Sequence, residues 1–533
     1  MTRRLPAPLL AAALLLPGAV EAQEVREAAR AVGRALPAAY EQKLRADPDA
    51  FEIRRGWTES ARTARRVDGA VRGTLPLLVV QALFTDSPEP SFTPQQVQAV
   101  LFDGPAPYGT LRDFYLQQSG QRLTVTGQVL PWVRTSARRA DAVDNPIAWL
   151  QDALRRVDAS VDFGQFDNDG PDNVPNSGDD DGYVDAVAFH FLEVSASCGG
   201  PGIWPHRSSV AGWRQADGTF SSAFRTADLR PNGQPVLVDD YITQSTVGCE
   251  GGLLTASTIA HEFGHILGLP DLYHPVDGLL PTQRRWVLGC WSLMAAGSWG
   301  CGSGSSFGET RRPPSLGPWE KQLLGWTREF VAGDVVDHEV TLPPVVSSGQ
   351  VLRVQVRQNE YFLLEFRPKT GFDTDLAAGG VLIYHVDRNL PLFPCGACSR
   401  QYAISLVEAD GNGSLLRTAA EGGNRGEAGD VWGNSGRTRF TTATTPSSKT
   451  TNGGMTEFAI HDITLGTSSA KIRLSTVFAR DRLLKSLLRA RSGDDLTDAE
   501  KAYLDANGNR NGRYDLGDFR IYLRNHPSVA TQT

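Results

Sequence analysis

Hydrophobic positions along the first half of the chain follow two periods, and their mixture predicts an α+β unit. Residues 75–84 form a continuous apolar run typical of a buried strand, whereas residues 122–129 alternate between apolar and polar as a half-buried strand does. Helical spacing is indicated for residues 146–157, and again by the apolar stripe Ala256, Ala260, Phe263 and Leu267. We therefore expect a twisted sheet with helices over residues 74–333.

Beyond this unit the pattern favours strands and then returns to helices. Apolar runs separated by Gly and Asn turns predict a β-sandwich over residues 334–478. Its expected strands are residues 351–357, 361–366, 381–386 and 471–474. Residues 479–533 have helical spacing on both sides of a Gly/Asn/Asp loop, which predicts a small helix-loop-helix appendage.

The first residues have the pattern of a secretory signal peptide. Arg3 and Arg4 precede an apolar run over residues 5–20, and the small-residue site at residues 20–22 suits cleavage, so we expect a signal peptide over residues 1–22. The alternative is a membrane anchor, but the run is short and interrupted by prolines, and no other stretch is long enough to span a bilayer. The prediction is a secreted, soluble protein.

Residues 23–73 are rich in Ala and Arg, and we interpret them as a propeptide. The alternative is a solvated helix at the start of the mature domain. This segment contains no cysteine, so latency through a thiolate that blocks a metal is excluded.

Length and charge limit the class of protein. A chain of 533 residues exceeds what one hydrophobic core usually organises, which agrees with several domains. The formal net charge of −7 argues against binding to nucleic acid and fits an exported protein that binds cations.

All six cysteines lie downstream of the signal peptide, and an even number in an exported chain predicts disulfides. Six cysteines allow fifteen connectivities, and we expect the local ones. The expected pairs are Cys290 with Cys301, Cys395 with Cys398, and Cys198 with Cys249. The C-x-x-C spacing of Cys395 and Cys398 also fits a redox pair or half of a metal site, although the chain has no second C-x-x-C and nothing around it looks like thioredoxin.

The strongest chemical pattern is an H-E-x-x-H motif at residues 261–265. Two histidines four residues apart lie on one face of a helix, so His261 and His265 can bind the same zinc ion while Glu262 acts as general base on a water. Gly268 is suited to end the helix, and the chain can then turn back to bring Asp271 to the metal. The motif thus predicts a zinc hydrolase.

Together with residues 291–299, which hold Met294 in a glycine-bounded turn, residues 261–273 resemble the immune inhibitor A-like family of secreted bacterial zinc metalloproteases. Further similar blocks are residues 108–115, 182–185, 319–326 and 380–387. The resemblance covers about residues 74–470 and implies a metzincin-like catalytic domain over residues 74–333, with Met294 in the Met-turn beneath the zinc.

The same resemblance implies the role of each residue in the motif. His261, His265 and Asp271 correspond to the zinc ligands, and Glu262 corresponds to the catalytic base. One position departs from the family pattern, because His274 stands where an aspartate is expected. His274 is therefore a candidate for a changed environment around the ligands, or for a spare ligand.

Two acidic loops predict calcium as a second cation. The first clusters Asp167, Asp169, Asp179, Asp181 and Asp185 between glycines, which suits a site built from oxygen ligands only. The family resemblance agrees, since members carry an Asp-rich segment here. The alternative is a solvated acidic loop.

The second loop lies in the carboxyl-terminal appendage and resembles a single dockerin or EF-hand loop. Its candidate ligands are Asp505, Asn507, Asn509, Asn511, Asp515 and Asp518. The loop departs from the usual pattern at Asn507, where aspartate normally comes first, and it has no paired second loop. The alternatives are a folded cap without a ligand and a module that binds a surface partner.

These patterns favour a secreted zinc endopeptidase that acts on proteins or peptides and is made as a zymogen. Two other functions remain open on the sequence alone. One is a cell-surface binding or scaffold protein with an inert zinc domain, and the other is a zinc amidase that acts on cell wall. The intact motif residues argue against inertness.

Overall fold

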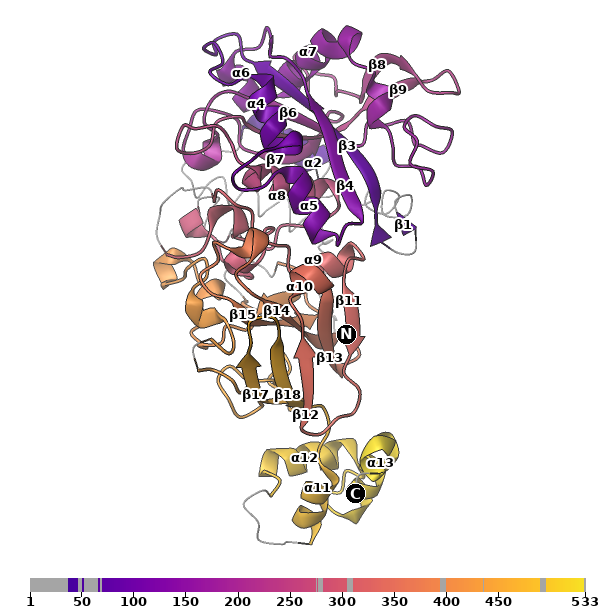
Figure 1. Ribbon diagram of the computed structural model, residues 1–533, viewed down its shortest axis with the longest axis vertical. Coiled ribbons are helices and arrows are strands. Elements are labelled where there is room, and N and C mark those ends of the chain that lie inside the picture. The colour runs from indigo at the N-terminus through magenta and orange to yellow at the C-terminus, as the bar shows by residue number, and fades with distance from the viewer. Residues whose placement is uncertain are drawn as a thin grey trace, which may run out of the picture.

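The computed structural model describes residues 37–46, 50–51, 66–67, 70–274, 276, 281–303, 310–393, 399–434, 436–488 and 495–531. The chain forms three parts stacked along the long axis of the molecule (Figure 1). We call them the upper part, up to α9 (Pro318–Leu323), the middle part, from β11 (Arg328–Val331) to β18 (Ala470–Ser475), and the tail. None of the described helices combines the length and the apolar character needed to span a membrane.

A six-stranded, mostly parallel sheet organises the upper part. Its order is β4-β3-β6-β10-β7, with β5 also paired to β3, and only the edge strand β7 runs antiparallel to its neighbour. The strands are β3 (Gly73–Leu83), β4 (Leu123–Val129), β5 (Val133–Arg134), β6 (Val187–Phe191), β7 (His206–Ser209) and β10 (Asp240–Ser245). The strands expected over residues 75–84 and 122–129 are thus confirmed to within two residues.

Alternate side chains of β3 enter two separate cores. Leu77 and Val79 belong to the cluster that contains the apolar faces of α5 (Leu111–Gln118) and α8 (Ala256–Ile266). Leu78 and Val80 belong to the cluster on the opposite face, which α7 (Ile147–Val157) covers. Both faces are buried, which explains why β3 is a continuous apolar run rather than an alternating one. The remaining elements are α4 (Pro94–Gln98), α6 (Arg139–Asp144), β8 (Phe224–Leu229) and β9 (Pro235–Val238).

The described part of the expected propeptide packs against the edge of this sheet. The Lys43 ammonium, on α2 (Ala38–Ala46), donates to the carbonyl oxygens of Ser209 and Ala211, each at 2.5 Å, and lies 4.6 Å from the ring centre of Trp213. The short strands β1 (Arg66–Val67) and β2 (Ala70–Val71) pair just before β3. Removal of residues 23–73 remains a prediction, and residues 1–22 lie outside the described residues.

The middle part contains two sheets that share one buried cluster. The larger has the order β11-β13-β14-β15-β16, and the smaller has the order β12-β18-β17. Their strands are β12 (His338–Leu342), β13 (Gln350–Arg357), β14 (Glu360–Arg367), β15 (Gly380–Asp387), β16 (Ile404–Leu406) and β17 (Ala459–Leu465), with α10 (Val345–Ser348) between β12 and β13. Strand β11 precedes the expected boundary at residue 333 yet pairs with β13. The description as a sandwich remains our interpretation.

The tail is a small helical unit with its own apolar cluster. It comprises α11 (Arg480–Leu487), α12 (Asp498–Asn507), α13 (Leu516–Asn525) and α14 (Pro527–Ala530). Glu457, in the middle part, accepts hydrogen bonds from the hydroxyls of Tyr503 and Tyr522, which attaches the tail to the sheets above it.

Two of the three expected disulfides are present. Cys198 pairs with Cys249, and Cys290 pairs with Cys301. Cys395 and Cys398 lie outside the described residues, so their pairing remains a prediction.

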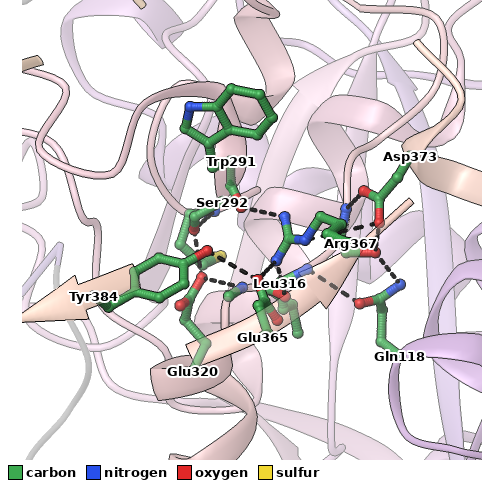
Figure 2. A network of polar contacts seen from close by, with 12 residues as sticks. Gln118, Trp291, Ser292, Leu316, Glu320, Glu365, Arg367, Asp373 and Tyr384 are labelled. Carbon is green, nitrogen blue, oxygen red and sulfur yellow. Dashed lines mark hydrogen bonds and ion pairs between the residues drawn. The ribbon is translucent and has the colours of Figure 1, made fainter. Parts of the chain in front are cut away.

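A buried polar network joins the upper and middle parts (Figure 2). Arg367, on β14, is 1% exposed and donates to the carbonyl oxygens of Trp291 and, at 3.2 Å, Leu316. Its guanidinium lies 2.5 Å from the buried carboxylate of Glu365. That carboxylate also accepts a hydrogen bond from the hydroxyl of Tyr384 at 2.9 Å. Because charged groups this deeply buried are costly without partners, the two parts depend on each other for stability.

We predict that Arg367→Met lowers the free energy of unfolding by about 3–5 kcal/mol, because it leaves the carboxylate of Glu365 buried and uncompensated. The measurement is urea-induced unfolding. The control is Lys471→Met, which removes an exposed ion pair with Glu339 and should cost at most about 1 kcal/mol. Equal losses in the two variants would contradict the importance of the network.

Candidate active site

Helix α8 carries the H-E-x-x-H motif and is fixed at several points along its length. Thr255 caps its first turn by accepting from the amide of Ser257, at 3.4 Å. The hydroxyl of Tyr115, on α5, donates to the carbonyl oxygen of Ala260 at 2.6 Å. The apolar stripe of the helix is buried in the core with α5, as its spacing predicts, which leaves His261 and His265 for the opposite side.

The end of α8 reverses the chain. Gly268 has φ +90°, a conformation that glycine adopts without a side-chain clash. Its amide donates to the carbonyl of His265, and the amide of Leu269 donates to the carbonyl of Gly264, both at 3.0 Å. This hydrogen-bond pair is the Schellman motif, and it turns the chain so that Asp271 returns to the histidines.

Backbone carbonyls orient both imidazoles. Nδ1 of His261 donates to the carbonyl oxygen of Leu293 at 2.9 Å, and Nδ1 of His265 donates to that of Leu269 at 2.8 Å. A neutral histidine that donates from Nδ1 keeps a free electron pair on Nε2. The two Nε2 atoms lie 3.0 Å and 3.6 Å from Oδ1 of Asp271, respectively.

The three side chains present the donor atoms of a metal site. Oδ1 of Asp271 is buried, and one ligand atom from each of His261, His265 and Asp271 lies within 4.8 Å of the others. Electron pairs that converge in a buried space repel each other unless a cation lies between them. Two imidazole nitrogens with one carboxylate oxygen suit zinc, and three protein ligands leave a fourth position open.

The carboxylates of the site differ in protonation. Burial raises the pKa of Glu262 to about 7. Burial would also raise the pKa of Asp271, but the neighbouring His265 and His261 outweigh it and lower this pKa to about 2. Glu262 is therefore the carboxyl group of the site that can exchange a proton near neutral pH.

The segment around Met294 lies directly beneath the helix. A Cβ atom on Gly264 would come within 2.6 Å of Sδ of Met294, so the methionine packs directly against the backbone of the helix at this glycine. The carbonyl oxygen of Met294 accepts from the amide of Leu272 at 2.7 Å. Since Leu293 accepts from His261, this one segment contacts one candidate ligand directly and the neighbour of another, Asp271.

His274 lies away from the three converging side chains. Its Nδ1 is 3.0 Å from the hydroxyl oxygen of Tyr402, and its ring also contacts that of Phe393, so it is buried against the middle part. It is absent from the described groups of side chains that are close enough to share a metal ion. The ring of Tyr273 packs beneath the guanidinium of Arg284, 4.2 Å away.

The first acidic loop brings three carboxylates together, and one of them, Asp180, was not among those expected. Asp167, Asp169 and Asp180 each offer an oxygen within 4.8 Å of the others. Asp167 is fully buried, and neither of its oxygens has a hydrogen-bond partner. Burial and the neighbouring carboxylates, Asp180 foremost among them, raise its pKa to about 8.

The other expected ligands of this loop lie around that group. Asp185 is buried and accepts from the amide of Asn168 at 3.2 Å, whereas Asp179 and Asp181 are exposed. Asp179 accepts from the hydroxyl of Ser177. Sequence reasoning did not name Asp180, because three consecutive aspartates give no signal for which side chain points inward.

In the tail, the candidate calcium ligands form hydrogen bonds with other groups of the same loop and of the helix before it. The carboxylate of Asp505 accepts from the amide of Gly512 at 3.2 Å, and that of Asp518 accepts from the amides of Asn509 and Asp515 at 2.7 Å and 2.8 Å. The side chains of Asn509 and Asn511 donate to Asp515, while Asn507 donates to the carbonyl of Tyr503. Calcium binding here remains a prediction.

Comparison with known proteins shows which family the upper part of the chain is similar to. The profile of a family described as "Immune inhibitor A peptidase M6, catalytic domain" matches residues 91–327. The matched segment is less than half of the chain and contains the whole H-E-x-x-H motif, Asp271, Met294 and the first acidic loop. The resemblance inferred from the motifs is therefore supported for the upper part.

Individual relatives agree with this match. Immune inhibitor A of Bacillus thuringiensis subsp. alesti is 29% identical over 241 residues, which cover 40% of this chain and 31% of the relative. The pre-pro-metalloprotease PrtV of Vibrio cholerae serotype O1 is 26% identical over 249 residues, which cover 43% of this chain and 25% of the relative. The chain thus aligns with about a third or less of the length of these relatives.

We predict that His265→Ala reduces zinc affinity by more than about 100-fold, because it removes a candidate ligand itself. Loss of a residue that only forms a hydrogen bond with a ligand costs about 10–100-fold. Zinc per chain is measured by mass spectrometry after dialysis against zinc-free buffer. The matched control is His274→Gln, a buried histidine near the site that should retain zinc. Zinc loss in the control but not in His265→Ala would contradict the assignment.

Proposed function

We propose that this protein is a secreted zinc-dependent endopeptidase in which His261, His265 and Asp271 bind the metal and Glu262 is the general base. The convergence of two Nε2 atoms on one buried carboxylate oxygen of Asp271 carries this proposal. The family match over residues 91–327 supports peptide bonds as the substrate. The signal-like pattern of residues 1–22 supports secretion.

Bound zinc would supply a Lewis acid that polarises the scissile carbonyl and lowers the pKa of a water. The residues of the chain perform the proton transfers. Glu262 takes a proton from the attacking water and delivers it to the leaving amine. Burial raises the pKa of this carboxyl group, which suits a group that must release the proton again. The carbonyls of Leu293 and Leu269 hold His261 and His265 by Nδ1 and leave Nε2 of each for the metal.

We predict that Glu262→Gln lowers kcat for hydrolysis of denatured casein by about 10²–10⁴-fold while zinc content stays unchanged, because the amide cannot accept a proton. The matched control is Glu250→Gln, an exposed glutamate that pairs with Arg311 and should leave kcat unchanged. A Glu262→Gln protein with wild-type kcat would overturn the mechanism. Purified cell wall is assayed in parallel, and activity on that substrate alone would replace the peptidase by an amidase.

We further propose that the first acidic loop binds calcium and stabilises the upper part. The support is the fully buried Asp167, whose two oxygens lack hydrogen-bond partners beside Asp169 and Asp180. An oxygen-only donor set suits calcium. The loop also contacts the sheet directly, since the amide of Thr74 donates to the side chain of Asn173 at 2.7 Å and Asn168 donates to the carbonyl of Thr74 at 2.8 Å.

We predict that calcium at about 100 times its Kd stabilises the wild type by about 2.7 kcal/mol through this loop, and that Asp180→Asn removes this gain. The comparison is Asp179→Asn, whose exposed carboxylate accepts from Ser177 and should retain the gain. Both are measured as thermal unfolding midpoints with and without calcium, at constant zinc. The opposite order of the two variants would favour Asp179 as the ligand.

A further inference from the structure

A further group of carboxylates lies in the middle part, in the loop that follows β16. Glu408 and Asp410 stand at the start of this loop and Asp430 at its end. Two backbone hydrogen bonds hold the ends together, from Ala409 to the carbonyl of Asp430 and from Asp410 to that of Gly429, both at 3.0 Å. As a result, one oxygen from each carboxylate lies within 4.8 Å of the other two.

Within the described part of the chain, no basic side chain forms an ion pair with this group of carboxylates. Among the ion pairs between described residues, none involves Glu408, Asp410 or Asp430. Glu408 is 4% exposed and Asp430 is fully buried. Burying carboxylates together without a cation is strongly unfavourable.

Neutral donors form hydrogen bonds with several oxygens of these carboxylates, but one buried oxygen has no hydrogen-bond partner. Glu408 accepts from the amide and hydroxyl of Ser414, both at 2.7 Å, and Oδ2 of Asp430 accepts from Nε1 of Trp291 and the amide of Glu427, both at 2.9 Å. Oδ1 of Asp430 is buried and has no hydrogen-bond partner. An orphaned oxygen of a fully buried carboxylate, beside two other carboxylates, points to a cation as its partner.

The dimensions and donor types suit calcium. Two oxygens that bind one calcium ion at 2.3–2.6 Å can be at most about 5 Å apart, and this group meets that limit. The group contains no histidine or cysteine, the ligands that zinc prefers. Its packing is specific, since a Cβ atom on Gly429 would lie 2.4 Å from Oδ2 of Asp410, so a side chain there would displace the carboxylate.

The same loop contacts the segment beneath the candidate zinc site. Besides the bond from Trp291 to Asp430, the carbonyl of Arg425 accepts from the amide of Cys290 at 2.6 Å. The carbonyl of Leu415 accepts from the amide of Trp286 at 2.9 Å. These contacts fall just before Leu293 and Met294, whose carbonyls accept from His261 and from Leu272, the neighbour of Asp271.

We propose that Glu408, Asp410 and Asp430 bind one calcium ion, and that this ion holds residues 408–430 against the segment that carries Leu293 and Met294. The ion offsets the buried negative charge of the three carboxylates, and it is the partner that Oδ1 of Asp430 otherwise lacks. The site is separate from the zinc centre and depends neither on its ligands nor on peptidase activity. It makes the middle part a support for the active site.

The test counts calcium per chain in the full-length protein. The background carries Asp180→Asn and Asp505→Asn, which removes one carboxylate from each of the other acidic loops. The protein is dialysed against about 5 mM free calcium, above the Kd of roughly 10⁻³ M of weak extracellular sites. We expect Asp410→Asn to lower the count by one calcium per chain, whereas Asp462→Asn, an exposed carboxylate on β17, leaves it unchanged. A folded Asp410→Asn protein with an unchanged count overturns the proposal.

A second measurement leaves all three carboxylates intact. Terbium replaces calcium at such sites, and its emission is excited by energy transfer from a nearby tryptophan. Because the indole of Trp291 donates to Asp430, we expect Trp291→Phe to lower the terbium emission of the background protein. Trp132→Phe, in the upper part, should not. Unchanged emission from Trp291→Phe, or no bound terbium at all, overturns the proposal even if Asp410→Asn does not fold.

Discussion

The backbone carbonyl of Leu293 fixes the tautomer of His261, and the geometry of the whole centre depends on that bond. It directs the free electron pair of Nε2 toward Asp271 and away from solvent. The next carbonyl, that of Met294, accepts from Leu272 and so fixes the segment that carries Asp271. Two adjacent peptide units therefore position groups that come from both sides of the helix end. A shift of this segment would move two of the candidate ligands at once, which is why its own support matters.

That support comes largely from the middle part of the molecule. Arg367 donates to the carbonyl of Trp291 from below, and Asp430 accepts from the indole of the same residue. Each contact places a polar side chain in a buried position, which is unfavourable unless its partners are complete. The two parts therefore share a buried interface next to the candidate active site, and the largest apolar cluster likewise runs through both.

Local patterns predicted much of this structure, and long-range proximity accounts for most of what they did not. The spacing of His261 and His265 on one helix face, and the helix stop at Gly268, follow from periodicity and backbone sterics alone. Strands β3 and β4 and helices α7 and α8 follow from periodicity in the same way. Asp180 was missed because side-chain direction in an irregular loop has no period. The group of Glu408, Asp410 and Asp430 was missed because its members are 22 residues apart in sequence at the extremes and meet only through backbone pairing.

The hydrogen bond from Trp291 to Asp430 joins residues that are far apart in sequence, so it can form only late in the synthesis of the chain. When the ribosome has completed the zinc-binding motif and the turn at Met294, the carboxylate that accepts from Trp291 and the guanidinium that donates to its carbonyl have not yet been made. A nascent chain at that stage contains His261, His265 and Asp271 but lacks these two contacts to Trp291. The contact with Asp430 can form only after more than a hundred further residues have been added. The segment beneath the candidate site therefore reaches its final surroundings only when the middle part of the chain has been made.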